Sequence, residues 1–177
     1  MQGCTLTFYI DSSKPKDSLD YHYSEIRYDG APDSDVPDVP PHWHKLHDEH
    51  MTVQEGRVEF IMDGKSYIRG PEDPTLVIPR RHVHGIRCIK GEAARFQERT
   101  NPVEEGLRKD EFFSDLLSEG RIRMSTAFRA AYTGDTVLVL TGIGFVDEAA
   151  RLVMGSFFAW WYPHKGKAKP ADGLLAR

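Results

Sequence analysis

Residues 40–56 read PPHWHKLHDEHMTVQEG, and residues 77–86 read VIPRRHVHGI; together they hold six of the eight histidines of the chain. His42 and His44 are two residues apart, so on a β-strand both rings lie on the same face. Glu49 follows past a short turn. Neutral imidazoles with a carboxylate suit Fe, Zn, Mn, Ni or Cu, whereas magnesium and calcium prefer oxygen ligands. The pattern therefore predicts a transition-metal site.

These two stretches resemble the two sequence motifs of the cupin superfamily, in a single-domain form with a barrel of the cupin type 2 kind. The first motif, with the spacing H-x-H-x4-E-x6-G, is matched by His42, His44, Glu49 and Gly56. The second motif is matched by Pro79 and His84. The resemblance covers roughly residues 35–100 and implies a β-barrel that holds one divalent transition metal. The ligands that it implies are His42, His44, Glu49 and His84.

The chain departs from the family pattern at positions that shape turns. Val36 and Asp73 stand where each motif opens with glycine, Arg81 replaces the glycine of the second motif, and Cys88 replaces its closing asparagine. The four implied ligands are intact, so we expect the metal site to survive these changes. Arg81 demands a backbone conformation that glycine adopts more easily. We expect Cys88 to point inward as a small core residue.

The rest of the first 102 residues shows strands separated by Gly, Pro and Asp turns. The expected strands are Thr5–Ile10, Tyr21–Tyr28, His42–Leu46, Met51–Gln54, Arg57–Met62, Lys65–Arg69, Thr75–Ile78, Gly85–Ile89 and Ala93–Thr100. Residues 29–41 contain four prolines and are expected to be extended or looped. Asp63-Gly64 indicates a two-residue hairpin of type I′. The strand pattern of residues 1–102 therefore predicts a mainly β domain, an all-β sandwich or barrel. The resemblance implies that it is an antiparallel cupin barrel of the jelly-roll (double-stranded β-helix) kind.

After Pro102 the pattern becomes helical. An apolar face is formed by Phe112, Phe113, Leu116 and Leu117. Two further helices are predicted at Ser125–Tyr132 and Asp147–Trp161. We expect residues 103–177 to be a helical extension that packs on the barrel, so that the chain forms a single structural domain.

The remaining polar groups near the motifs have two interpretations each. His82 is two residues before His84, and we assign it a catalytic role in proton transfer, against a purely structural one. Arg81, with its neighbour Arg80, is either solvated or recognises an acidic substrate at the barrel mouth. His47 is expected at the surface and His50 on the outside of its strand, although any of these imidazoles can move protons near neutral pH.

Three classes of function fit this site. The first is a metal-dependent oxygenase, a non-haem dioxygenase or related oxidoreductase, acting on a small organic substrate such as an enolic compound. The second is a non-redox isomerase, decarboxylase or cyclase, in which the metal acts as a Lewis acid and His82 or Glu49 moves the proton. The third is a non-catalytic cupin that binds a small molecule. Dependence on dioxygen and on a redox-active metal separates the first two classes.

The composition of the chain limits the kinds of partner that it is expected to bind. The net charge of −4 over 177 residues argues against nucleic acid. Two distant cysteines and an N-terminus without a secretory pattern favour the cytoplasm. Residues 136–162 are apolar, but Asp147, Glu148 and Arg151 interrupt them, so no membrane span is expected. The aromatic residues after 156 need burial inside the molecule or at an interface. Cupins often pair through barrel edges, so the resemblance implies a homodimer.

Overall fold

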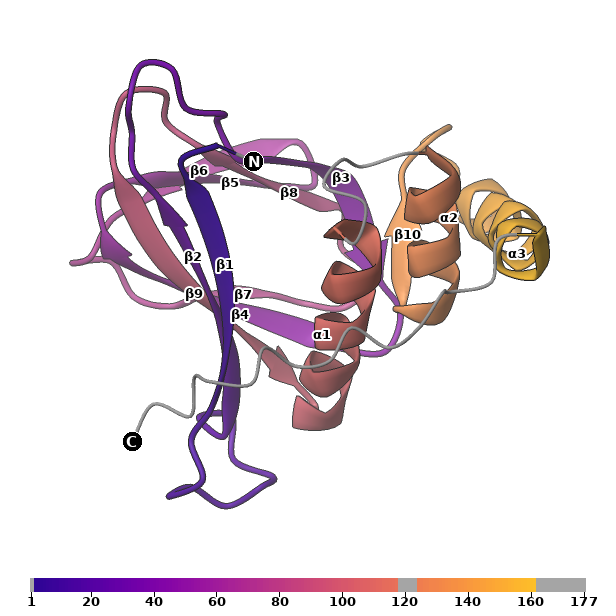
Figure 1. Ribbon diagram of the computed structural model, residues 1–177, viewed down its shortest axis with the longest axis horizontal. Helices are drawn as coiled ribbons and strands as arrows, with labels where there is room; N and C mark the ends of the chain where they lie inside the picture. The colour runs from indigo at the N-terminus through magenta and orange to yellow at the C-terminus, as the bar shows by residue number, and fades with distance from the viewer. Residues whose placement is uncertain (1, 118–123, 162–177) are drawn as a thin grey trace.

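The fold is an antiparallel β-barrel built from two five-stranded sheets (Figure 1). The computed structural model describes residues 2–117 and 124–161. Sheet A has the strand order β1-β2-β9-β4-β7, and sheet B has the order β10-β3-β8-β5-β6. The strands are β1 (Cys4–Ile10), β2 (His22–Tyr28), β3 (Asp38–His44), β4 (Asp48–Glu55), β5 (Val58–Met62), β6 (Lys65–Arg69), β7 (Leu76–Ile78), β8 (His84–Cys88), β9 (Ala94–Asn101) and β10 (Thr136–Leu138). This confirms the predicted mainly β, cupin-type barrel.

The nine strands predicted before residue 103 are present, β6 with the predicted ends and the other eight with shifted ends. β3 begins at Asp38 rather than His42, because the end of the proline-rich stretch is extended and pairs with β8. β4 is longer than predicted and includes Glu49. The hairpin between β5 and β6 has positive φ at both Asp63 (50°) and Gly64 (77°), as a type I′ turn requires.

Three helices gather at one end of the barrel: α1 (Val103–Leu117), α2 (Met124–Thr133) and α3 (Gly144–Trp161) (Figure 1). α1 packs on β9 and β2, α2 lies beside α1, and α3 packs on α2 as the outermost element. The predicted extension 103–177 falls outside the described residues at 118–123 and 162–177. Within the described residues, no helix is both long and apolar enough to cross a membrane.

β10 is a strand that the sequence analysis did not predict. It follows α2 and pairs antiparallel with β3, placing Thr136 opposite His44 and Leu138 opposite His42. Val137 is fully buried between these partners. A three-residue strand inside a segment of helical pattern carries too little periodicity to be recognised. Because of β10, the strand that carries His42 and His44 has a neighbour on both sides.

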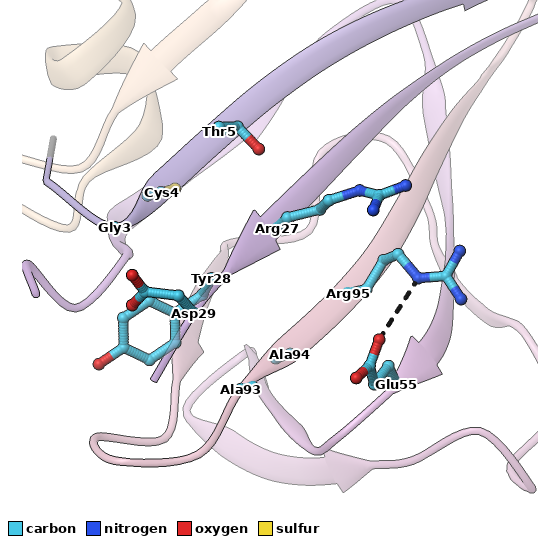
Figure 2. Close-up of a pocket in the computed structure, with 10 residues that line it drawn as sticks. All are labelled: Gly3, Cys4, Thr5, Arg27, Tyr28, Asp29, Glu55, Ala93, Ala94 and Arg95. Carbon is cyan, nitrogen blue, oxygen red and sulfur yellow. Dashed lines mark ion pairs between the residues drawn. The ribbon is translucent and has the colours of Figure 1, made fainter. Parts of the chain in front are cut away.

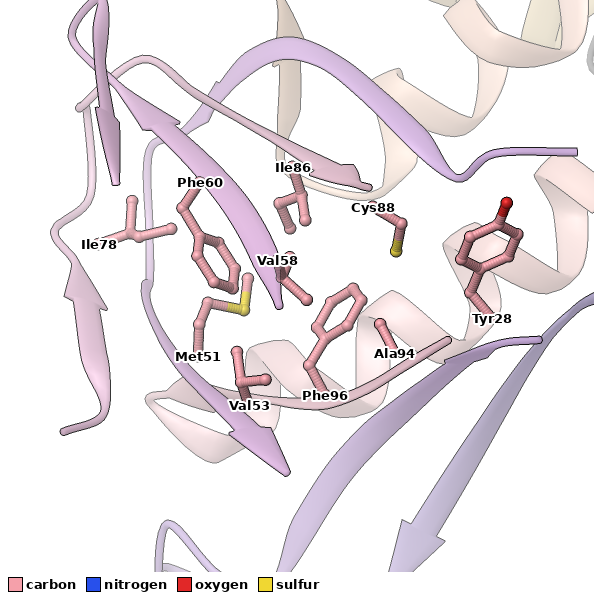
Figure 3. Close-up of a cluster of buried hydrophobic side chains, with 10 residues drawn as sticks. All are labelled: Tyr28, Met51, Val53, Val58, Phe60, Ile78, Ile86, Cys88, Ala94 and Phe96. Atoms are coloured by element: carbon pink, nitrogen blue, oxygen red, sulfur yellow. The ribbon is translucent and has the colours of Figure 1, made fainter. Parts of the chain in front are cut away.

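The apolar core fills the space between the two sheets (Figure 3). Sheet B contributes Val58, Phe60, Ile86 and Cys88, and sheet A contributes Tyr28, Met51, Val53, Ile78, Ala94 and Phe96. Cys88 is therefore a core residue, as predicted, and burial raises the pKa of its thiol to about 12. Strand alternation places Glu49 on the same face of β4 as Met51 and Val53. The core thus continues directly into the polar site described next.

Candidate metal centre

Four buried side chains from three strands meet inside the barrel. His42 and His44 come from β3, and His84 comes from β8, where it is the direct register partner of His42. Glu49 reaches the same point from β4 in the opposite sheet. None of the four is more than 7% exposed, and their ligand-type atoms lie within 4.8 Å of one another. The structure brings the four predicted ligands together; their role as ligands stays a prediction.

Each of the three imidazoles is oriented by a backbone carbonyl. The Nδ1 atoms contact the carbonyl oxygens of Pro40 (from His42, 2.9 Å), Asp135 (from His44, 2.9 Å) and His82 (from His84, 3.0 Å). A carbonyl oxygen only accepts hydrogen bonds, so each Nδ1 carries the proton in a neutral ring. The opposite nitrogen, Nε2, is then a bare lone pair in all three rings.

The Nε2 lone pairs of two of these histidines face the carboxylate of Glu49. His44 Nε2 lies 2.8 Å from Oε1 of Glu49, and His84 Nε2 lies 3.1 Å from Oε2. Within the described part of the chain, neither Nε2 atom nor Oε2 has a hydrogen-bond partner. Acceptors that face each other at this distance repel unless a proton or a metal cation lies between them. The cluster therefore has the donor set and orientation of a cation site.

Burial sets the protonation of the histidines. Desolvation, together with the neighbouring rings, holds the pKa of His42 well below its ordinary value. Desolvation and the charge of Lys109 lower the pKa of His44 to about 4. Burial also opposes the charged form of His84, but the contact with Glu49 raises its pKa above the ordinary value. At neutral pH His42 and His44 are thus neutral, which is the form that binds metals.

Lys109 of α1 is a residue that the sequence analysis missed. It is buried, and its ammonium group donates to Oε1 of Glu49 and, at 2.5 Å, to Oε1 of Glu98 from β9. Burial disfavours the charge, but the two carboxylates outweigh it and raise the pKa of Lys109 above its ordinary value. Burial alone would raise the pKa of Glu49; Lys109 and His44 instead hold it well below the usual range. A permanent positive charge therefore borders the cluster.

Close packing of α1 on β2 brings Lys109 into the barrel. A Cβ atom on Gly106 would lie 2.8 Å from Nδ1 of His22, so glycine allows the helix to approach. Asp110 then contacts Nε2 of His22 at 3.0 Å. The sequence carried a signal for Lys109, because it lies three residues before Phe112 and four before Phe113, on the predicted apolar face.

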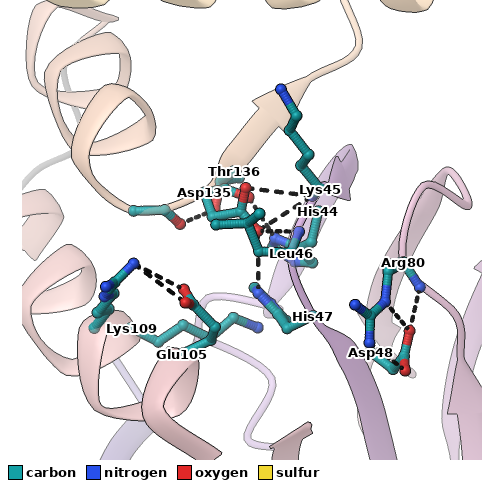
Figure 4. A network of polar contacts seen from close by, with 12 residues as sticks. His44, Lys45, Leu46, His47, Asp48, Arg80, Glu105, Lys109, Asp135 and Thr136 are labelled. Carbon is teal, nitrogen blue, oxygen red and sulfur yellow. Dashed lines mark hydrogen bonds and ion pairs between the residues drawn. The ribbon is translucent and has the colours of Figure 1, made fainter. Parts of the chain in front are cut away.

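His47 corrects a prediction. It was expected at the surface, but it is 1% exposed and its ring stacks on that of His44 with centroids 4.1 Å apart. Its Nδ1 lies 3.2 Å from Oδ2 of Asp135, whose carboxylate also accepts from the backbone N–H groups of Lys45 (3.1 Å) and Leu46 (2.7 Å) (Figure 4). The turn before β10 covers the turn after β3, and this burial could not be read from either segment alone.

The two predicted catalytic residues approach the cluster through their backbones. The side chain of His82 is exposed and its Nδ1 lies 2.6 Å from Oδ2 of Asp63, while its carbonyl oxygen orients His84. Arg81 is exposed, and its backbone N–H donates to the carbonyl of His44 at 2.7 Å. Its φ of 69° confirms the expected strain at this position. The catalytic roles of both side chains stay predictions.

Neither of the two surface hollows described has a member of the cluster in its wall. The larger, about 450 Å³, lies along sheet A, where Arg95 faces Glu55 at 3.7 Å (Figure 2). The other is lined in part by His50, which lies on the outer face of β4 as predicted. Access to the cluster therefore does not run through either hollow.

Similar solved structures include cupin domains with different roles. The structure of KdgF from Halomonas sp. has a TM-score of 0.43 and 19% identity, over 56% of this chain and 79% of that one. The polyketide cyclase RemF from Streptomyces resistomycificus has a TM-score of 0.42 and 24% identity, over 57% of this chain and 66% of that one. The Cupin_2 domain of an XRE family transcriptional regulator from Enterobacter cloacae has a TM-score of 0.41 and 19% identity, over 56% of this chain and 96% of that one.

No protein-family model matches the chain, and no curated protein matches its sequence. The fold assignment therefore rests on the two sheets and on the strands that carry the motifs. Both agree with the β-barrel that the resemblance to the cupin superfamily implies. These similarities concern the barrel, and the chemistry has to be argued from the residues inside it.

Proposed function

We propose that this protein is a metal-dependent enzyme that acts on a small organic substrate. The proposed ligands of one divalent transition metal are His42, His44, Glu49 and His84. The observation that carries the proposal is the tautomeric state of the histidines: backbone carbonyls hold the protons on Nδ1, and the Nε2 lone pairs converge beside a carboxylate. Fixing imidazoles through Nδ1 is how proteins orient metal-binding histidines.

Lys109 does not replace the metal in this arrangement. Its ammonium group contacts Oε1 of Glu49, whereas Oε2 and the Nε2 atoms of His44 and His84 lack hydrogen-bond partners among the described residues. Three buried acceptors without a donor are costly, at about 1–3 kcal/mol each. A bound metal ion would satisfy all of them at once. The set of three imidazoles and one carboxylate suits Fe, Zn, Mn, Ni or Cu.

The oxygenase class is the first proposal for the reaction. A metal held by four protein ligands would keep positions open for dioxygen and for one donor atom of a small substrate. In this class the protein orients the substrate and excludes water. The buried side chains of Met51 and Ile86, two residues along their strands from Glu49 and His84, would help to exclude water. Uptake of dioxygen with enolic or phenolic substrates is the test of this class.

The buried pair of Lys109 and Glu98 favours a second candidate, a non-redox lyase, isomerase or cyclase. These reactions stabilise an enolate and move a proton, and the metal would act as a Lewis acid. The ammonium group holds protons at Nζ beside Glu49, and Glu98 is a carboxylate whose pKa burial raises. An activity that needs no dioxygen and persists with zinc would select this candidate. His82 and Arg81 stay predicted contributors at the exposed edge.

The first experiment measures the metal content of untagged protein purified without chelator. We expect about one transition-metal ion per chain in the wild type and in His50→Ala, and at least a tenfold loss in His44→Ala. His50 is the matched control, because it lies next to Glu49 on the outer face of β4. Iron, copper or nickel favours the oxygenase, and zinc favours the Lewis-acid candidate. Absence of metal from all three proteins, even after incubation with these ions, would contradict the proposal.

A further inference from the structure

Every charged side chain of helix α3 faces the protein. Oδ1 of Asp147 accepts from the backbone N–H groups of Thr141 (2.8 Å) and Leu140 (3.2 Å). Arg151 donates to the carbonyl oxygens at the end of α2, at 3.1 and 3.3 Å. Glu148 pairs with Lys45 of the turn after β3 at 2.9 Å. The charged side chains of the helix are therefore all engaged on its inner side.

A glycine fixes which side of α3 is the inner one. A Cβ atom on Gly155 would lie 2.5 Å from Cβ of Tyr132 and 2.8 Å from the carbonyl oxygen of Phe128, so the helices α2 and α3 are in close contact here. Phe158 stacks on Phe128 from the same side, with ring centroids 6.3 Å apart. The opposite side of α3 is thereby turned away from the protein.

The outward side is an apolar face without charge. It consists of Phe145, Ala149, Leu152, Val153, Ser156, Phe157, Trp160 and Trp161, all exposed. Phe145 is 79% and Trp160 is 75% exposed. The hydroxyl of Ser156 contacts the carbonyl of Val153 within the helix at 3.1 Å. A surface helix of a monomer normally shows the reverse pattern, with polar residues outside.

The apolar face is large enough for a stable interface. Its four aromatic side chains alone expose on the order of 500 Å², taking 150–250 Å² for each complete side chain. The aliphatic members bring the face toward the roughly 800 Å² that each partner buries in a standard interface. Contiguous exposed apolar patches of this size mark a contact with another molecule.

We propose that two copies of this chain associate through α3, with the two helices antiparallel. A two-fold axis between Leu152 and Val153 places six of the eight face residues opposite one another in the two copies. Phe145 of one copy then lies opposite the partner's Trp160, and small residues, Ala149 and the partner's Ser156, lie between them and the axis. Such an isologous contact must be self-complementary. Because the face carries no charge, pairing it with a second copy brings no like charges together.

The charge pattern favours a second copy over a lipid surface. Helices that lie in membrane interfaces carry Lys and Arg on their polar side, toward anionic headgroups. Within the described part of α3 the basic residue is Arg151, which is occupied by the carbonyl groups of α2. The uncharged face offers no electrostatic attraction to such a surface.

The test begins with light scattering of the full chain. We expect a species of about twice 20.1 kDa for the wild type, and a monomer for Val153→Glu with an unchanged circular dichroism spectrum. Ile68→Glu is the matched control, because Ile68 is an exposed apolar residue on β6, the edge strand of sheet B. We expect it to stay dimeric. Dissociation by Ile68→Glu alone, a monomeric wild type, or binding of the wild type to phosphatidylserine vesicles without dimerisation would each overturn the proposal.

Disulfide trapping tests the antiparallel geometry. In a Cys4→Ser background, Val153→Cys lies next to the axis, and we expect it to cross-link two copies under oxidation. Phe145→Cys should not cross-link, since the two positions lie about 20 Å apart along antiparallel helices. Cross-linking of Phe145→Cys with none of Val153→Cys would contradict this arrangement.

Discussion

The ammonium group of Lys109 and the carboxylate of Glu49 are in direct contact inside the barrel, although the two residues lie 60 positions apart. Glu49 belongs to the predicted metal-binding motif, whereas Lys109 belongs to a helix outside it. One carboxylate would thus be shared between a fixed cation of the protein and the proposed metal ion. The balance between these two cations would set the properties of the site.

Replacing Lys109 by Met should destabilise the metal-free protein and strengthen its response to metal. Without the ammonium group, Glu49 and Glu98 are buried without compensation, and we expect the free energy of unfolding to fall by about 3–5 kcal/mol. A bound divalent ion restores the charge, so the increase in melting temperature on adding metal should be larger in the variant. Calorimetry with and without metal measures both quantities.

The control for that prediction is Lys45→Met, which removes a partly exposed ion pair with Glu148. Such pairs contribute about 0–1 kcal/mol, so little change is expected. Equal stabilisation of the wild type and Lys109→Met by metal would show that the ammonium group and the metal do not compete for Glu49.

The stability of the metal-free protein should fall with acidification. The pKa of His44 is about 4 in the folded state and about 6.5 when unfolded, so the unfolded state takes up the proton first. Stability is therefore lost between about pH 6.5 and pH 4, by up to about 3 kcal/mol for this group. The raised pKa of His84 acts in the opposite direction and offsets part of the loss. Urea unfolding of the wild type and His44→Gln across this range measures the difference.

In this pH series His44→Gln should have a shallower dependence than the wild type. Identical slopes for the wild type and His44→Gln would mean that the proton uptake belongs to other groups.

Asp135→Ala should weaken metal binding although Asp135 is not one of the four proposed ligands. Its carboxylate holds the turn of Lys45 and Leu46 and contacts His47, and its carbonyl orients His44. Loss of a group that positions a ligand typically lowers metal affinity 10–100-fold. Competition with a chelator measures this change.

The φ of Asp135 is 49°, so alanine also introduces backbone strain. Asp135→Gly removes the carboxylate without that strain, and Asp135→Asn keeps an acceptor without the charge. If the glycine variant binds metal as tightly as the wild type, the carboxylate does not position the site.

Arg81→Gly should leave metal content unchanged and raise the free energy of unfolding by up to about 1 kcal/mol. The gain in stability arises because a φ of 69° is unfavourable for arginine but carries no steric cost for glycine. The greater flexibility of glycine in the unfolded chain reduces this gain. Arg80→Gly, at a neighbouring position without positive φ and with an ion pair to Asp48, should not be stabilised. Chemical denaturation measures the free energy of unfolding of both variants. A loss of stability in Arg81→Gly would show that the backbone of Arg81 is not strained.

The strands of the barrel and the pattern of His42, His44 and Glu49 were predictable because their signals are local, whereas His84 was expected as a ligand only from the family resemblance. The spacing of His42, His44 and Glu49 fits within one strand, one turn and the next strand, and the alternation of β4 separates Glu49 from His50 without any tertiary information. The hairpin at Asp63 and Gly64 was likewise predictable from its two turn residues alone.

The groups around the cluster depended on tertiary contacts. His47 is buried because Asp135, far along the chain, covers its turn. β10 pairs with β3 although nothing in its three residues requires a strand. Lys109 and Glu98 did carry a signal, since each is a charged residue on an otherwise apolar face, beside Phe112 and Phe96 respectively. Single charged residues on apolar faces therefore merit attention as buried partners.

The hydrogen bond between His44 and the carbonyl of Asp135 joins positions 91 residues apart. A ribosome adds about 5–20 residues per second, so roughly 5–20 s separate the synthesis of the two groups. During that interval the nascent chain has its histidines but not the acceptor that fixes the tautomer of His44. For the proposed metal ion, acquisition in the final geometry would consequently be a late step of biogenesis, after translation has passed β10.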